Sequence, residues 1–203
     1  MESYKEFEQF LEKLDKRPKL LLHSCCAPCS SSVLMLLNKY FMMDIYYYNP
    51  NIYPEEEFIK RKNEQIKFLD KTSHNKFIPG TYEPLKYEEV ISGLEEEKEG
   101  GARCYKCIYM RMEKTCLYAK EHGYDYFTTT LSVSPHKNSK IINEIGYLLE
   151  EKYGVSYLFS DFKKRDGYKK SILLSREYDL YRQDYCGCKY SENFTKKVNN
   201  TLV

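Results

Sequence analysis

The feature that most constrains this chain is a short apolar run, Lys19–Leu22, followed directly by three cysteines within the eight-residue stretch His23–Ser30 (HSCCAPCS). The run has the length of a buried strand, and the serines at positions 30 to 32 are suitable N-caps for a helix. A strand that passes into a helix places the intervening loop at its carboxyl end, where open α/β sheets bind ligands. Three cysteines there exceed what ordinary core packing needs, and they predict a metal centre.

Apolar strands and amphipathic helices alternate along the rest of the chain. We expect strands at Lys19–Leu22, Met43–Tyr48, Lys76–Ile78, Tyr126–Leu131 and Tyr157–Phe159. We expect helices at Ser3–Lys16, Ser30–Tyr40, Pro54–Lys71, Tyr105–His122, Ser139–Tyr153 and Gly167–Tyr181, whereas Glu83–Gly101 is charged and interrupted by glycines. This alternation predicts an α/β protein with three layers and a mostly parallel, doubly wound sheet.

Composition narrows the class of protein. Lysine and arginine total 32 against 30 acidic residues, so the net charge of +2 argues neither for nor against a nucleic-acid partner. No apolar run is long enough to span a bilayer, and the charged N-terminus lacks the apolar core of a signal peptide. We therefore expect a cytoplasmic protein without membrane contact, whose eight cysteines are metal ligands or redox groups rather than structural disulfides.

Two cysteine pairs are the expected arms of the metal site. Cys25-Cys26 and Cys104-x-x-Cys107 both precede predicted helices, whose positive amino ends stabilise thiolates. A Cys-x-x-Cys pair fits zinc, an iron–sulfur cluster or thioredoxin-like chemistry. Adjacent cysteines suit an iron–sulfur cube better than a structural zinc knuckle, because the cube spreads its ligands over several irons. The simpler alternative is that these are buried, unligated cysteines.

The remaining cysteines divide into three cases. Cys186-Gly187-Cys188 can close a strained, reactive disulfide or bind one metal through both sulfurs, and the spacing does not separate these readings. Cys29 is either a further ligand or part of the helix start. Cys116, among apolar helix residues, is expected to be inert core.

Five blocks of the sequence together resemble the QueH-type epoxyqueuosine reductases: 23–29 (HSCCAPC), 48–52 (YNPNI), 101–107 (GARCYKC), 128–137 (TTTLSVSPHK) and 185–188 (YCGC). The resemblance implies that residues 1–203 form one domain that reduces epoxyqueuosine to queuosine at the wobble position of tRNA, the last step of queuosine synthesis. It also implies a sheet related to the PP-loop (HUP-type) nucleotide-binding folds. The glycine-serine phosphate loop of those folds is absent, so no ATP is expected.

The same resemblance implies the cofactors. It assigns a 4Fe–4S cluster to Cys25, Cys26, Cys104 and Cys107, and it matches Cys186 and Cys188 to a redox-active disulfide pair. Family members are thought to hold an additional iron beside the cluster. Cys29 stands where others have aspartate, which makes it a candidate ligand for this second, mononuclear iron. A flavodoxin- or ferredoxin-type protein is the expected electron donor.

A base in an anticodon loop is recognised by a basic rim with aromatic stacking. The run Lys163, Lys164 and Arg165, followed by Tyr168, is the first candidate tRNA contact, and 60–62 (KRK) is the second. A charged, solvated helix face explains either run more simply.

The leaving epoxide oxygen needs a proton, for which His136, Tyr185 and Asp184 are candidates. His136 reads equally well as a solvated loop histidine. His23, at the end of the strand, is expected to orient a cysteine sulfur by a hydrogen bond.

Two rival functions remain open at this level. One is a zinc-stabilised RNA-binding module without redox activity. The other is a thiol–disulfide oxidoreductase that acts through Cys186-Gly187-Cys188.

Overall fold

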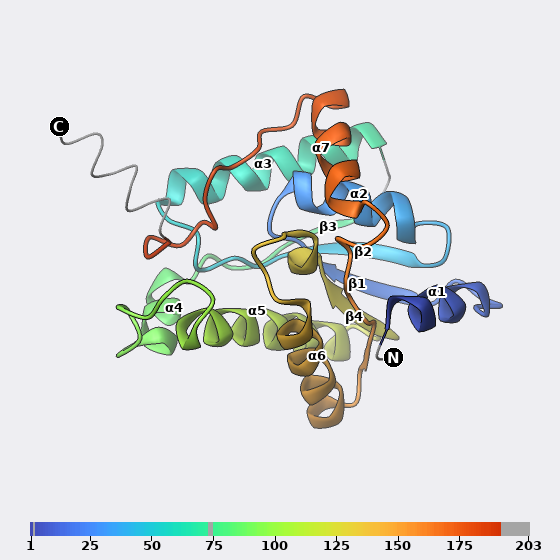
Figure 1. Ribbon diagram of the computed structural model, residues 1–203, viewed down its shortest axis with the longest axis horizontal. Coiled ribbons are helices and arrows are strands. Elements are labelled where there is room, and N and C mark those ends of the chain that lie inside the picture. Colours follow the sequence, from blue (N-terminus) through green and yellow to red (C-terminus); the bar gives the residue numbers. More distant parts are fainter. Residues whose placement is uncertain (2, 73–74, 192–203) are drawn as a thin grey trace.

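The computed structural model describes residues 1, 3–72 and 75–191 as a five-stranded sheet with helices on both faces (Figure 1). The strands are β1 (Lys19–His23), β2 (Met42–Tyr47), β3 (Phe77–Pro79), β4 (Tyr126–Thr129) and β5 (Ser156–Tyr157). The α-helices are α1 (Tyr4–Glu12), α2 (Ala27–Leu37), α3 (Glu55–Thr72), α4 (Pro84–Ile91), α5 (Ala102–Glu121), α6 (Ser139–Tyr153) and α7 (Gly167–Glu177), with a 3₁₀ turn at Thr130–Val133. No helix in these ranges is long and apolar enough to cross a membrane.

The sheet is entirely parallel, with the strand order β3-β2-β1-β4-β5. The chain runs outward from β1 through β2 to β3, and it then returns to the other side of β1 to form β4 and β5. The order therefore reverses between β1 and β4, and the loops after these two strands meet at the point where such sheets bind ligands. The predicted three-layer α/β class is confirmed.

Side chains alternate between the two faces of the sheet, as the period of two in a strand requires. Leu21 packs in one core with residues of α4, α5 and α6, whereas Leu20 and Leu22 pack in a second core with residues of α1, α2 and α3. Figure 1 shows α4, α5 and α6 below the sheet and α2, α3 and α7 above it. Since β1 is buried on both faces, it reads as a continuous apolar run.

Two helices start earlier than predicted, and this changes the position of the cysteines. Helix α5 begins at Ala102 with Gly101 as its N-cap, so Cys104 and Cys107 lie inside its first turns instead of preceding it. Helix α2 begins at Ala27, because Pro28 fits the first turn, where a missing N–H costs nothing. Cys29 is therefore part of the helix.

Other element bounds differ at their ends. The expected strand at Tyr126–Leu131 stops at Thr129, since Thr129 Oγ1 accepts a hydrogen bond from Leu131 N at 3.2 Å and begins the 3₁₀ turn. Strand β5 is one residue earlier and shorter than expected, and α7 ends at Glu177. Helix α4 lies in the charged region for which no element was predicted.

Candidate metal centre

Three cysteines at the carboxyl end of β1 form a group that could hold a metal ion. The sulfurs of Cys25, Cys26 and Cys29 all lie within 4.8 Å of one another, and no other cluster of three or more potential ligands this close occurs among the described residues. Cys25 Sγ and Cys26 Sγ are 3.7 Å apart. Two thiolates on one tetrahedral ion, each about 2.3 Å from the metal, would be roughly 3.8 Å apart, so this spacing suits a single ion.

The helix start arranges these thiols. Cys26 is the N-cap of α2, and its Sγ accepts a hydrogen bond from Cys29 N at 3.4 Å. Hydrogen bonds from Cys26 and Cys29 hold the pKa of Cys25 well below its usual value. Burial raises the pKa of Cys26 to about 12, and hydrogen bonds with Cys25 and Cys26 raise the pKa of Cys29. The three thiols are therefore electrostatically coupled, and binding of a metal to them would release protons.

Polar side chains from distant segments contact the group. Thr130, the first residue after β4, places Oγ1 3.4 Å from Cys25 N and 3.7 Å from Cys25 Sγ. Gln183 donates from Nε2 to Cys26 Sγ at 2.9 Å, while its buried Oε1 has no hydrogen-bond partner in the structure. The thiols are thus contacted by one residue directly after β4 and by one in the segment after α7.

His23, two residues before Cys25, is fully buried but does not bond a sulfur. Its Nδ1 lies 2.8 Å from Thr129 Oγ1, and its Nε2 lies 3.0 Å from the Tyr48 carbonyl. Burial, together with the nearby positive charge of Arg111, lowers the pKa of His23 to about 3, so the ring is neutral. Its bonds join β1 to β4 and to the residue that follows β2, and the prediction that His23 orients a cysteine sulfur is wrong.

The second cysteine pair lies on α5. Cys104 Sγ accepts a hydrogen bond from Gly100 N at 3.2 Å, and Cys107 is 8% exposed. Burial raises the pKa of Cys107 to about 11. These two sulfurs do not belong to the group within 4.8 Å, in which Cys29 takes the third place beside Cys25 and Cys26. The predicted ligand set of the cluster remains a prediction.

One turn after Cys107 on α5, Arg111 is buried among the cysteines. Its Nη1 lies 4.0 Å from Cys107 Sγ, and its Nη2 donates to Asn49 Oδ1 at 2.6 Å. Asn49 Nδ2 in turn donates to the Ser24 carbonyl at 2.9 Å. Arg111 therefore links α5 to the loops that follow β1 and β2.

Cys186 and Cys188 are free thiols in the structure. Cys186 Sγ accepts a hydrogen bond from Lys137 Nζ at 3.1 Å, and Cys188 is 7% exposed. The backbone turns between them at Gly187, which has a φ of 112°. Their predicted role as a redox-active pair, or as ligands of a second iron, stays a prediction.

A buried arginine on α3 holds this loop. Arg61 donates to the carbonyls of Tyr185 and Cys186 at 3.4 Å each, and it forms an ion pair with Glu57 at 2.6 Å. The 60–62 run is therefore not a continuous RNA contact, because Arg61 is 2% exposed and Lys60 lies over the Tyr181 ring at 3.5 Å.

Three of the eight cysteines line one cleft of about 550 Å³. Its lining includes Cys25, Cys29, Cys186, Arg111 and Lys137. It also includes His136, Asp184, Tyr185, Tyr168, Arg182 and Gln183. All three predicted proton donors therefore lie at the cleft, although Tyr185 donates its hydroxyl to the Tyr53 carbonyl at 2.5 Å.

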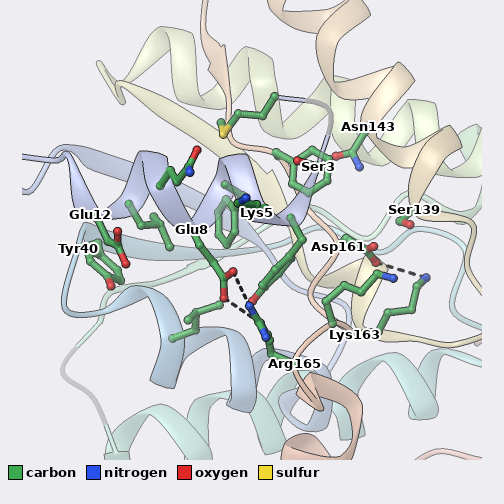
Figure 2. Close-up of a pocket in the computed structure, with 18 of the residues that line it drawn as sticks. Ser3, Lys5, Glu8, Glu12, Tyr40, Ser139, Asn143, Asp161, Lys163 and Arg165 are labelled. Carbon is green, nitrogen blue, oxygen red and sulfur yellow. Dashed lines mark hydrogen bonds and ion pairs between the residues drawn. The ribbon is translucent and has the colours of Figure 1, made fainter.

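The predicted tRNA contacts are divided between this cleft and a larger groove of about 1630 Å³ beside α1 (Figure 2). Tyr168 lines the cleft, with the Arg182 guanidinium 5.8 Å from its ring. Lys163, Lys164 and Arg165 line the groove, which contains no cysteine.

Two of these basic side chains have partners within the protein. Arg165 forms an ion pair with Glu8 at 3.0 Å. Lys163 donates to the Lys137 carbonyl at 2.8 Å, so it supports the residue that contacts Cys186. Lys164 is exposed.

The sequence did not predict the contacts of Arg111, Lys137 and Gln183 with cysteine sulfurs. It also did not predict that Arg61 holds the 185–188 loop through hydrogen bonds to two backbone carbonyls. One signal was available for Arg111, because a cysteine and an arginine four residues apart share a helix face. Lys137 directly follows His136 in a block that was already singled out. The contacts of Gln183 and Arg61 join segments more than 100 residues apart and have no local signature.

Comparison with known proteins matches most of the chain to one family. The family described as Epoxyqueuosine reductase QueH matches residues 20–194. The protein of that name from Staphylococcus epidermidis is 44% identical over 187 residues, which cover 89% of this chain and 79% of that protein. The Staphylococcus aureus protein is 45% identical over 86% of this chain and 76% of its own length. The Thermotoga maritima protein is 37% identical over 85% of this chain and 89% of its own length.

Proposed function

The chain belongs to the QueH family of epoxyqueuosine reductases, and we propose that it reduces epoxyqueuosine to queuosine at the wobble position of tRNA with an iron–sulfur cluster. The observation that carries this proposal is the cleft, where Cys25, Cys29 and Cys186 line one cavity with a buried arginine. Such a set of soft sulfur ligands suits iron–sulfur chemistry.

The cysteines supply the soft thiolate ligands that such a cofactor takes. Cys25, Cys26, Cys104 and Cys107 would hold the 4Fe–4S cluster, and Cys29 would bind an additional mononuclear iron. The buried Arg111 is suited to balance the negative charge of several thiolates. When bound, the cluster would supply low-potential electrons one at a time.

The reaction defines what the side chains must do. Two electrons and two protons convert the epoxide into an alkene and water, so the cleft must hold proton donors near the oxygen. The negative charge of the Cys186 sulfur raises the pKa of Lys137 against the effect of burial, which keeps Nζ protonated. His136 is exposed at the same cleft and remains the candidate that delivers a proton to the oxygen.

Recognition of an unpaired base calls for a stacking surface next to the cysteines. Tyr168 and Arg182 provide an aromatic ring and a guanidinium at the cleft, and both groups stack on bases. Lys164 is an exposed cation for a phosphate. We propose a flavodoxin- or ferredoxin-type protein as the electron donor.

The rival readings predict different results. The spacing of Cys25, Cys26 and Cys29 also suits zinc, so a zinc-stabilised RNA-binding module predicts a colourless protein with one zinc and no conversion of tRNA. A thiol–disulfide oxidoreductase predicts that Cys104→Ala retains activity and that Cys188→Ala abolishes it. The reductase proposal predicts that both variants are inactive.

The test is anaerobic reconstitution with iron and sulfide, followed by incubation with a reductant and tRNA that contains epoxyqueuosine. Mass spectrometry of the digested nucleosides should show queuosine. Cys116→Ser is the matched control, since Cys116 is buried in the core and donates to the Leu149 carbonyl at 3.9 Å, away from the cleft. A brown, reducible protein that forms no queuosine would overturn the proposed function.

A further inference from the structure

Arg111 is a buried cation for which no carboxylate partner occurs among the described residues. It is 2% exposed, as are Arg61 and Arg103. Arg61 has the Glu57 carboxylate at 2.6 Å, and Arg103 donates to four backbone carbonyls, those of Leu94, Glu95, Glu97 and Tyr190. Within the described part of the chain, Arg111 has only the Asn49 amide oxygen and the Cys107 sulfur as partners, and its buried Nε has none.

A guanidinium in such a place requires nearby negative charge, because an unpaired buried charge is very unfavourable. The groups around it that can carry this charge are cysteines. Cys107 Sγ lies 4.0 Å from Arg111 Nη1, and Cys25 and Cys186 line the same cleft as Arg111. These three sulfurs come from α5, the loop after β1 and the loop after α7, so Arg111 lies at the junction of the three cysteine segments.

The position of the guanidinium is fixed by a chain of hydrogen bonds. Asn49 accepts from Nη2 at 2.6 Å and donates to the Ser24 carbonyl at 2.9 Å. Ser24 directly precedes Cys25. The charge is thus held at a constant place relative to the thiols, in a setting with little water to screen it.

We propose that Arg111 is the fixed counter-charge of the cysteine centre and that it raises the reduction potential of the iron–sulfur cluster. This inference rests on the proposed function, because it assumes that the centre holds a cluster. An electron that enters the cluster adds negative charge, and a cation nearby in a low-dielectric site stabilises the reduced form. Arg111 is in this sense a positioning residue, which acts through the centre and not on the tRNA.

The test is a redox titration of the reconstituted protein, with the cluster followed by electron paramagnetic resonance. Arg111→Gln should shift the midpoint potential to more negative values. Arg111→Lys keeps the charge but loses the fixed geometry, so its shift should be smaller. Asn49→Ala removes the hydrogen-bond acceptor of Arg111 Nη2. It should also shift the midpoint potential to more negative values, by less than Arg111→Gln does.

Lys114→Gln is the matched control. Lys114 lies three residues further along α5 and is partly exposed. Its Nζ lies 5.9 Å from the centre of the Tyr48 ring and has no contact with a cysteine among the described residues. Its removal should leave the potential at the wild-type value, because solvent screens the charge.

A wild-type potential in Arg111→Gln at normal cluster content would overturn the inference. If that variant does not fold, wild-type potentials in both Arg111→Lys and Asn49→Ala would overturn it instead. Failure of the proposed function is distinct, since the potential would then shift in the variants although the wild-type protein forms no queuosine. A wild-type protein that takes up zinc and no cluster would overturn both.

Discussion

Lys137 Nζ donates a hydrogen bond to Cys186 Sγ at 3.1 Å, although the two residues are 49 positions apart. The contact joins the loop after β4 to the loop after α7 across the cleft. Lys163 Nζ supports it by donating to the Lys137 carbonyl at 2.8 Å. A hydrogen bond from an ammonium group is charge-assisted and therefore stronger than one between neutral groups.

We therefore expect Lys137→Gln to slow the alkylation of Cys186. A hydrogen bond to a charged group contributes about 1.5 to 3 kcal/mol, so the rate should fall by roughly tenfold or more. Iodoacetamide labelling of the metal-free protein, followed by peptide mass spectrometry, measures the rate at Cys186 alone. Lys140→Gln is the control, because Lys140 is exposed in the first turn of α6 and should not affect the rate. Equal rates in wild type and Lys137→Gln would show that the contact does not activate the thiol.

Cys29 should be a ligand of the centre and not filler at the start of a helix. Its sulfur lies within 4.8 Å of those of Cys25 and Cys26. Cys29→Ser should lower the iron content of the reconstituted protein but keep the visible absorbance of the cluster, whereas Cys25→Ser should lose both. Iron analysis and absorbance spectra of the two variants check this. Full iron content in Cys29→Ser would assign Cys29 to packing alone.

Gly187 should be essential for the placement of Cys186 and Cys188. Its φ of 112° is unfavourable for other residues, and an added Cβ would lie 3.0 Å from both Arg61 Nη1 and Ile52 Cγ1. Gly187→Ala should reduce queuosine formation by more than tenfold.

Gly93→Ala is the control for Gly187→Ala, because it introduces backbone strain without crowding any neighbouring atom. Gly93 also has a positive φ, of 78°, but nothing lies within 4 Å of its added Cβ. Both variants carry a strain of order 1 to 3 kcal/mol, and only Gly187→Ala disturbs the loop. A similar loss of activity in both variants would contradict this account.

The ion pair between Arg61 and Glu57 should stabilise the contact between α3 and the 185–188 loop, which Arg61 makes through its hydrogen bonds to that loop. Their side chains are 1% and 11% exposed, and Glu57 also accepts from the Tyr181 hydroxyl at 3.1 Å. Arg61→Met leaves the Glu57 carboxylate unpaired and should lower the free energy of unfolding by about 3 kcal/mol. Adding Glu57→Gln should restore part of it. Urea denaturation of the two single variants and the double variant measures the coupling, and additive losses would mean that the pair is not coupled.

Local signals in the sequence predicted much of the fold. Helix α6 has the predicted bounds, since Asn138 caps its start through a 3.0 Å hydrogen bond to Lys140 N, and Gly154 ends it with a φ of 75°. The apolar run before the cysteines gave β1, because a central parallel strand is buried on both faces. The grouping of Cys25 and Cys26 at a strand end followed from the same reasoning.

Long-range contacts could not be predicted in this way. Arg165 was a candidate for tRNA, but Glu8, 157 residues away, is its partner in the fold. The contact between Arg111 and Asn49 spans 62 residues, and nothing near either residue marks it. Cys29 joined the other two cysteines because α2 begins three residues earlier than the serines suggested.

The most direct test of the central claim follows the cluster and the product in one reaction. Reconstituted protein is reduced, freed of reductant and mixed anaerobically, in excess, with tRNA that contains epoxyqueuosine. Electron paramagnetic resonance follows the reduced cluster while mass spectrometry measures queuosine. We predict that the signal decays as fast as queuosine forms and that tRNA already containing queuosine leaves it unchanged. Queuosine that forms while the signal persists, or a persistent signal with no queuosine, would contradict the claim that these cysteines hold the reducing centre.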